Sequence, residues 1–230
     1  MRLLPIICLF IIACSNPDQA TTSDKANAME ENKVDSSLSI NKEEDNIDDE
    51  RSNWQKPDYI IKSLGNLEGK TIADIGSGPL GYFVFKLLGQ TDASKVIAID
   101  IDKEAIGMLN VLKNALSTDK SERLDVRLAE ANNPKLDKEE TDIILIVNTI
   151  AYFPDRLNYL KNLKESLKPG GQLIIIDFKM KRIPDYVEAP PYNSRTYLNI
   201  IEEELYAAGY NNITTNDTSL EYQYLISAEK

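Results

Sequence analysis

Three glycines and one acidic residue have the types and spacing that nucleotide binding requires. Gly76, Gly78 and Gly81 form a G-x-G-x-x-G motif within "ADIGSGPLGYF" (73–83). Glycines let the main chain approach a ligand closely, and the following helix N-terminus attracts an anion. Asp100 lies 24 residues after Gly76, where a carboxylate can accept hydrogen bonds from both hydroxyls of a ribose. The pattern therefore predicts a ligand that contains a ribose.

Each acidic residue also has an interpretation without a ligand. Asp74 could cap a turn, because aspartate favours turns. Asp100 and Asp102 could be solvated acids that stabilise the start of a helix. Their occurrence together with the glycine loop and with the Pro-Gly-Gly turn at 169–171 favours a ligand site.

The surrounding sequence predicts the elements that hold these residues. Apolar runs, typical of parallel strands buried on both faces, occur at 70–76, 95–102, 141–148 and 172–178. A further strand is expected at 124–130, and helices are expected at 82–89, 103–117, 155–168 and 196–210. The final strands, 211–217 and 221–227, follow one another without a helix. The predicted fold class is α/β, an open, mostly parallel Rossmann-like sheet with helices on both faces and an antiparallel C-terminal edge hairpin.

Ligands of such sheets bind beyond the carboxyl ends of the strands. The loops expected there are 76–81, 100–102, 130–134 and 148–155.

The composition restricts the chemistry of the site. The 230 residues include no histidine, and the two cysteines, Cys8 and Cys14, both precede the folded part. Histidine-based catalysis and thiolate chemistry are therefore excluded there, and we expect no metal site. Residues 51–230 carry 26 acids and 22 bases, a net charge of −4, so no nucleic-acid partner is expected.

The N-terminus predicts export. An apolar run at 3–13 is too short to span a bilayer and has the length of a secretory core region. It ends in "IIAC", which resembles the lipobox of bacterial lipoproteins. We therefore expect a lipoprotein signal peptide over 1–13, a lipidated Cys14, and membrane anchoring in the bacterial cell envelope. Residues 14–50 are acidic and polar, and predict a disordered tether.

The folded part, 51–230, resembles the class I S-adenosylmethionine-dependent methyltransferases. The resemblance covers about residues 51–228 and is carried by "ADIGSG", "VIAIDID", "AEANNP" and "LKPGGQLIIIDF". It implies S-adenosylmethionine as cofactor, with Asp74 near the methionine amino group, Asp100 on the ribose and Ile101 beside the adenine. Glu130 or Asn132 would meet the adenine amino group. The implied cofactor-binding set is Asp74, Gly76, Ser77, Gly78, Asp100, Ile101, Glu130, Ala131, Asn132 and Asn148.

Two features depart from the family pattern. Pro79 and Leu80 make the glycine loop one residue longer than the family's usual turn, which either widens the methionine pocket or displaces Gly81. The segment 148–156 lacks the histidines that related sequences often carry there. Methyl transfer depends mainly on positioning, so a site without histidine or cysteine is chemically adequate.

The catalytic residues are not determined by the sequence. If the acceptor needs a proton removed, the candidates are Tyr152, Asp155 and Asp177. Each has an alternative structural role: Tyr152 as pocket wall and Asp155 as the N-cap of the following helix, while Asp177 ends the fifth strand. Asn148 could likewise satisfy a strand end.

The expected function is methyl transfer to an unknown acceptor, a small molecule or another partner. A methyltransferase-like binding lipoprotein without activity is an alternative, because the predicted export separates the protein from a cytosolic methyl donor. An NAD-binding Rossmann protein is less favoured, because no residues remain for a substrate domain.

Overall fold

The computed structural model describes residues 50–230. The predicted signal peptide, the lipidation of Cys14 and nearly all of the predicted tether lie outside these residues. Glu50, the last residue of that tether, already belongs to a helical segment over residues 50–55. Within residues 50–230, no helix has the length and apolar character needed to cross a bilayer.

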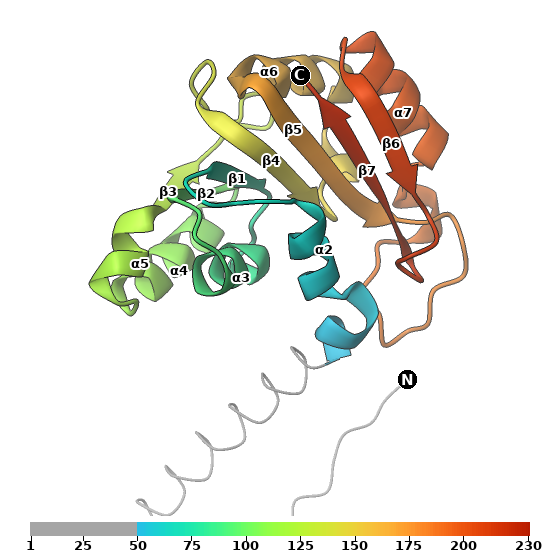
Figure 1. Ribbon diagram of the computed structural model, residues 1–230. Helices are drawn as coiled ribbons and strands as arrows, with labels where there is room; N and C mark the ends of the chain where they lie inside the picture. The colour runs from blue at the N-terminus through green and yellow to red at the C-terminus, as the bar shows by residue number, and fades with distance from the viewer. Residues whose placement is uncertain (1–49) are drawn as a thin grey trace, which may run out of the picture. The chain divides into compact units, whose positions relative to one another are not determined.

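A seven-stranded sheet forms the centre of the described domain (Figure 1). The strand order is β3-β2-β1-β4-β5-β7-β6, and the first five strands in this order are parallel to one another. β7 is antiparallel to both β5 and β6. The predicted fold class is therefore confirmed, including the C-terminal hairpin. The strands are β1 (Thr71–Ile75), β2 (Lys95–Asp100), β3 (Leu124–Leu128), β4 (Thr141–Val147), β5 (Leu167–Phe178), β6 (Asn211–Asn216) and β7 (Gln223–Glu229).

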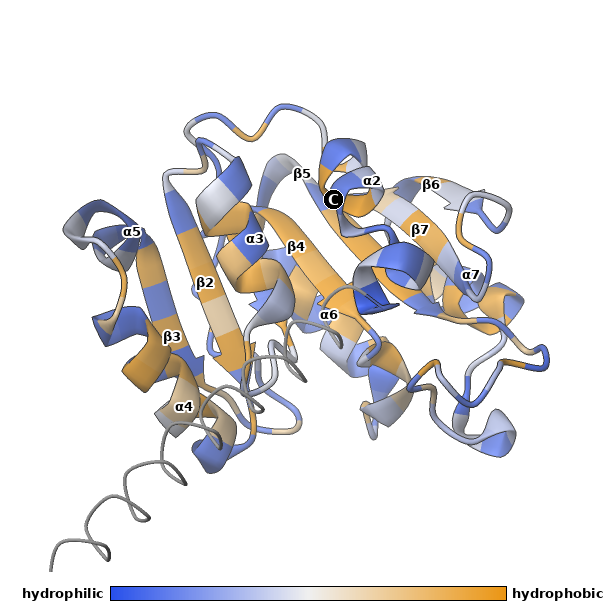
Figure 2. Cartoon of the chain, turned by 90° about the horizontal axis from the view of Figure 1, so that it is seen from below, coloured by the Kyte–Doolittle hydropathy of each residue, from blue (hydrophilic) through white to orange (hydrophobic). Residues whose placement is uncertain are grey.

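Helices cover both faces of the sheet because the central strands are apolar on both sides. Two successive residues of β1 illustrate this, because their side chains point to opposite faces of the sheet. Ile72 belongs to one hydrophobic cluster, whereas Ala73 belongs to the other. The first cluster includes buried residues of α2 (Pro57–Ser63), α3 (Tyr82–Gln90) and α4 (Lys103–Asn114). The second includes buried residues of α6 (Arg156–Ser166) and α7 (Leu198–Ala207). Figure 2 shows continuous apolar colouring along β2 and β4, whereas edge strand β3 alternates.

Several expected boundaries differ from the structure. The helix expected at 103–117 ends at Asn114, and a separate short helix that was not predicted, α5 (Thr118–Arg123), follows it. β5 begins at Leu167, before the Pro-Gly-Gly turn, and the register of its pairing with β4 shifts between Thr141 and Ile143. The turn is thus an irregularity within a strand rather than the start of one. Short 3₁₀ helices, η1 (Ile150–Tyr152) and η2 (Tyr192–Ser194), were not predicted.

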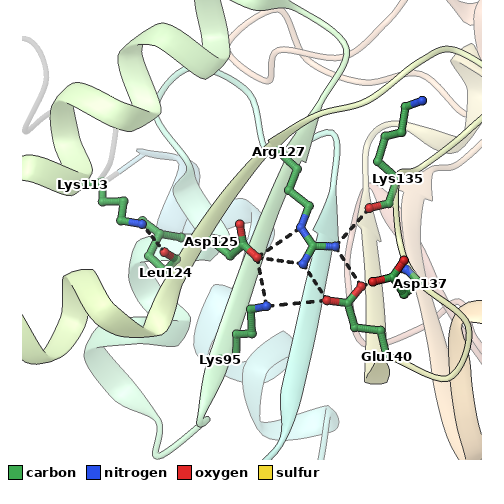
Figure 3. Close-up of polar contacts among 8 residues, drawn as sticks. All are labelled: Lys95, Lys113, Leu124, Asp125, Arg127, Lys135, Asp137 and Glu140. Carbon is green, nitrogen blue, oxygen red and sulfur yellow. Dashed lines mark hydrogen bonds and ion pairs between the residues drawn. The ribbon is translucent and has the colours of Figure 1, made fainter.

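A charged cluster fastens the connection between β3 and β4 to the sheet (Figure 3). Arg127 donates to both carboxylate oxygens of Glu140, at 2.6 and 2.8 Å, and forms an ion pair with Asp125 at 2.7 Å. Lys95 bridges Asp125 and Glu140 at 2.9 and 3.6 Å. Arg127 also donates to the main-chain oxygen of Lys135. The cluster therefore fixes the loop that carries part of the predicted ligand site.

Candidate functional site

The glycine loop after β1 lies against the segment that follows β4. Gly76 has φ of 79°, and a Cβ at this position would lie 2.3 Å from Oγ1 of Thr149. A side chain is therefore excluded by both the backbone conformation and the neighbouring chain. Gly78 also has a positive φ, 66°, but nothing lies within 4 Å of its Cβ direction. The loop thus packs tightly at its first glycine and leaves open space at its second.

Asp100 joins the end of β2 to the glycine loop. Its Oδ2 accepts from the Gly78 N–H at 2.8 Å, and its Oδ1 accepts from the Asp102 N–H at 3.0 Å. A carboxylate has about four acceptor positions, so these bonds leave capacity for two ribose hydroxyls. Asp102 is the N-cap of α4, because its side chain accepts from the Glu104 N–H. The two acids therefore have separate roles.

Ser77 holds the loop to both flanking strands. Its hydroxyl donates to the main-chain oxygen of Asp74 at 3.0 Å and accepts from the Ile99 N–H at 3.1 Å. The Gly76 and Ser77 N–H groups both donate to the Ile99 oxygen. The loop is therefore preorganised by bonds to β1 and β2.

Two cavities adjoin at the carboxyl ends of β1, β2 and β4. The first, about 250 Å³, is bordered by the ends of β1 and β2, by the residues after β3 and by η1. The second, about 260 Å³, is bordered by the glycine loop, the start of α3 and the end of β4. Gly76, Asn148 and Thr149 line both. We call them the nucleoside-side cavity and the loop-side cavity.

Nine of the ten predicted cofactor-binding residues line these cavities. In the nucleoside-side cavity lie Gly76, Asp100, Ile101, Glu130, Ala131 and Asn148. In the loop-side cavity lie Asp74, Gly76, Ser77, Gly78 and Asn148. Asn132 lines neither; it borders a separate polar hollow with Asn133 and Pro134. Of the two predicted partners for an adenine amino group, Glu130 is therefore the one that the structure places at the cavity.

Asp74 is a buried carboxyl group at the end of β1, with only 3% of its surface exposed. Desolvation raises the pKa of Asp74 to about 7, although the Ser77 hydroxyl and the Arg51 guanidinium each lower it. Nearby Asp100 contributes a smaller increase to the same pKa. A buried carboxylate of this kind favours a cationic partner, because a positive charge would offset its desolvation.

Asn148 adopts a left-handed conformation at the end of β4, with φ of 59°. Its side-chain oxygen accepts from the Gln223 amide, and Gln223 in turn accepts from the buried Gln55 amide at 3.3 Å. Asparagine tolerates this backbone region better than most residues. The chain of amides connects the residue at the border of both cavities to the helical segment over residues 50–55.

The three catalytic candidates lie in different surroundings. Tyr152 lines the nucleoside-side cavity and is 64% exposed. Asp155 is the N-cap of α6, as the sequence predicted, and accepts from the Asn158 N–H at 3.3 Å. Asp177 lines neither cavity. The structure therefore does not bring the three candidates together as a catalytic group.

Asp177 is almost completely buried at the end of β5, with 1% of its surface exposed. Its Oδ1 accepts from the Phe178 N–H at 2.6 Å, whereas its Oδ2 has no partner with ordinary hydrogen-bond geometry. Desolvation raises the pKa of Asp177 to about 6, and the Phe178 and Ala151 N–H groups lower it. Ala151 belongs to η1, so this carboxyl group lies next to that helix.

Several residues that border the cavities were not predicted as site residues from the sequence. Thr149, Pro154 and Tyr159 line the nucleoside-side cavity. The loop-side cavity is also lined by Arg51, Tyr82 and Phe83. Thr149 lies within a loop that the sequence predicted to be part of the site. Arg51, in contrast, precedes all four motifs that carry the family resemblance.

Comparison with known proteins places this site in a family. A family profile described as "Methyltransferase domain" matches residues 66–225. The chain belongs to the methyltransferase-domain family. Within residues 66–225 lie the glycine loop, Asp100 and the residues after β3 and β4. The cofactor of this methyltransferase domain is S-adenosylmethionine.

Relatives and solved structures agree with this assignment. The domain is 26% identical to a SAM-dependent methyltransferase from Aquifex aeolicus, with a TM-score of 0.68, covering 78% of this chain and 92% of that one. A tRNA U34 carboxymethyltransferase of Klebsiella pneumoniae is 30% identical over 56% of this chain and 37% of its own length. A demethylmenaquinone methyltransferase of Lactococcus lactis is 28% identical over 56% of this chain and 50% of its own length. The chain thus matches half or less of these two relatives.

The residues present fit S-adenosylmethionine. The loop-side cavity contains a buried carboxylate for an ammonium group and, at Gly78, open space where a side chain would intrude. The nucleoside-side cavity joins it at Gly76 and contains Asp100 for the ribose. The longer glycine loop does not close the site, because Pro79 and Leu80 lie on the border of an open cavity.

Proposed function

We propose that this protein transfers the methyl group of S-adenosylmethionine to a small-molecule acceptor. The observation that carries the proposal is the pair of adjoining cavities, one with Asp74 and the glycine loop, the other with Asp100. Asp74 would hold the donor's ammonium group, and Asp100 would accept hydrogen bonds from its ribose. When bound, the donor supplies an electrophilic methyl group on a sulfonium.

Positioning would account for most of the rate acceleration. The Asp100 bonds to Gly78 and Asp102 fix the loop before a ligand arrives, so little ordering remains for the bound state. Thr149 and Asn148 lie where the two cavities meet and would border the reacting methyl group. An acceptor that is already nucleophilic at neutral pH fits this site, because methyl transfer then needs no group to remove a proton.

The charge of the domain supports a small acceptor over a nucleic acid. Residues 51–230 carry a net charge of −4, and a nucleic-acid partner favours clustered positive charge. The K. pneumoniae relative is named for a tRNA substrate, but the chain matches only 37% of its length. We therefore propose a methyl-donor site for this chain, but not the tRNA acceptor of that relative.

The test measures donor binding and methyl transfer with the full chain. Calorimetry with S-adenosylmethionine, S-adenosylhomocysteine and NAD is expected to give micromolar binding of the first two and none of NAD. Radiolabelled methyl from the donor should then appear in small-molecule extract fractions and not in bulk tRNA. Donor binding without transfer to any fraction would favour the binding-protein alternative, and binding of NAD alone would overturn the donor site.

We further propose that Cys14 carries a lipid that anchors the protein in the bacterial cell envelope. The support is the sequence "IIAC" after an apolar run of eleven residues, 3–13. Expressed in bacteria, the Cys14→Ser variant should leave the membrane fraction, and the unchanged chain should remain there. Persistent membrane association of Cys14→Ser in high salt would overturn the anchor.

A further inference from the structure

The helical segment over residues 50–55 is built into the site, although it precedes the family match at residue 66. Trp54 packs on Phe178 with ring centroids 5.8 Å apart, and Ser52 shares a 3.1 Å hydrogen bond with the Tyr82 hydroxyl. Gln55 is completely buried and donates to Gln223 at 3.3 Å. These contacts join the segment to β5, α3 and β7.

Arg51 is held in a fixed position on the wall of the loop-side cavity. Its guanidinium carbon lies 3.9 Å from the centroid of the Tyr82 ring, and its Nε donates to the Gln55 side-chain oxygen at 2.7 Å. Ring stacking and a hydrogen bond at Nε orient the plane of a guanidinium group. Arg51 and Tyr82 both line the cavity.

The loop-side cavity thus has one fixed cation and one buried anion in its walls. Arg51 is close enough to Asp74 for its charge to lower the pKa of that carboxyl group. An α-amino acid group carries an ammonium and a carboxylate on one carbon atom. A cavity with Asp74 and Arg51 in its walls matches both charges of such a group.

We propose that Arg51 binds the carboxylate of the donor's methionine half, while Asp74 binds its ammonium group. This assignment rests on the proposed function, because it concerns the same donor site. Arginine suits the role, since its planar fork can donate two parallel hydrogen bonds to a carboxylate. Donor recognition would therefore depend on a residue that lies outside the family's matched region, in the segment immediately after the predicted tether.

The rival explanation places the carboxylate on main-chain N–H groups. α3 begins after Gly81 with no side-chain cap, and its first residues, Tyr82 and Phe83, line the same cavity. Helix N-termini attract anions. The two explanations differ in whether the donor's carboxylate and Arg51 are energetically coupled.

The experiment compares two ligands that differ only in that carboxylate, S-adenosylmethionine and its decarboxylated form. Calorimetry would use the full chain, the Arg51→Met variant and a matched control, Lys86→Met. Lys86 also lies over the Tyr82 ring, 4.7 Å from its centroid, but it does not line the cavity. Arg51→Met should weaken S-adenosylmethionine binding about 10- to 100-fold, as expected for a hydrogen bond between charged groups. The loss for the decarboxylated ligand should be much smaller, because that ligand has no carboxylate and is affected only through the higher pKa of Asp74. Lys86→Met should alter neither affinity.

Other outcomes would overturn the assignment. An equal loss for both ligands in Arg51→Met would show that Arg51 only supports the shape of the cavity. No loss for either ligand would place the carboxylate on the N-terminus of α3. If the unchanged chain binds neither ligand, the proposed function fails as well, so the two failures are distinguishable. Thermal unfolding of Arg51→Met in the absence of ligand checks that this variant is folded.

Discussion

The main-chain N–H of Gly78 donates a 2.8 Å hydrogen bond to the Asp100 carboxylate. The glycine loop after β1 and the acid at the end of β2 are therefore one unit rather than two separate motifs. Parallel pairing sets their distance, because β1 and β2 pair in register up to Ile75 and Ile99. A ligand that contacts both residues meets a geometry that exists before it binds.

Asp100 should contribute to donor binding both directly, through the ribose, and by holding Gly78 in place. Asp100→Ala should weaken S-adenosylmethionine binding by about 2–4 kcal/mol, because hydrogen bonds from the ribose to a charged group and the fixed position of Gly78 are both lost. Asp100→Asn retains one acceptor oxygen and should give a smaller loss. Calorimetry on the three proteins measures the difference. An unchanged affinity in Asp100→Ala would remove the ribose assignment.

Gly76 should tolerate no side chain. Gly76→Ala places a Cβ in a left-handed conformation and 2.3 Å from Thr149 Oγ1, and we expect a loss of about 2–5 kcal/mol in unfolding free energy. Gly107→Ala is the matched control, since Gly107 is helical, exposed and has nothing within 4 Å. That control should stabilise the protein by about 0.5–1 kcal/mol. Urea unfolding tests both, and equal stability of the two variants would contradict the close packing at Gly76.

Donor affinity should increase with pH up to about 7. Burial raises the pKa of Asp74 to about 7, so below that pH the group is mostly protonated and cannot pair with an ammonium group. We expect the affinity for S-adenosylhomocysteine to fall about tenfold for each pH unit below 7. In Asp74→Asn the affinity should be weaker and nearly independent of pH between 5 and 7. A pH dependence that persists in Asp74→Asn would assign the titration to another group.

Deprotonation of Asp74 should lower the free energy of unfolding of the ligand-free protein as the pH rises. The folded-state pKa of Asp74, about 7, exceeds its ordinary value of 3.8, so the folded state binds the proton more tightly. Its contribution to stability is complete below pH 4 and is lost as the pH rises through 7. Asp177, raised to about 6, acts in the same direction. Asp74→Asn should therefore have a flatter stability profile than the unchanged chain between pH 5 and 8.

The charged cluster around Arg127 should have the opposite pH dependence. Its hydrogen bonds to Glu140 lower the pKa of that carboxyl group below its ordinary 4.5, so its stabilising effect exists at neutral pH and is lost in acid. Arg127→Met should cost about 1–3 kcal/mol at pH 7. A double-mutant cycle with Glu140→Gln measures the coupling of the pair, which should decrease as the pH falls through the lowered pKa of Glu140. Coupling that does not change in acid would mean that the pair is not held by charge.

The amino-acid sequence by itself determined the layers of this domain and the centre of its donor site. Continuous apolar runs specify strands covered on both faces, and the order of strands and helices specifies a mostly parallel sheet. Glycines and acids at the ends of those strands were predictable, because the carboxyl ends of neighbouring parallel strands meet at one edge. For that reason Gly76, Gly78 and Asp100 were recognised from their spacing as a site for a ligand with a ribose. The role of Asp74 was implied only by the family resemblance.

The tertiary structure decided which side chains complete the walls of the site. Arg51 reaches the loop-side cavity and Gln223 reaches Asn148 through packing between segments far apart in the chain. Such contacts leave no periodic trace in the sequence. The bond between Gln55 and Gln223 spans 168 residues. Asn132, expected near the adenine, turned out to border another hollow, because the fold of the loop after β3 and not its composition directs its side chains. Local patterns specify the elements, whereas the presence of both Asp74 and Arg51 in the walls of one cavity depends on the assembled chain.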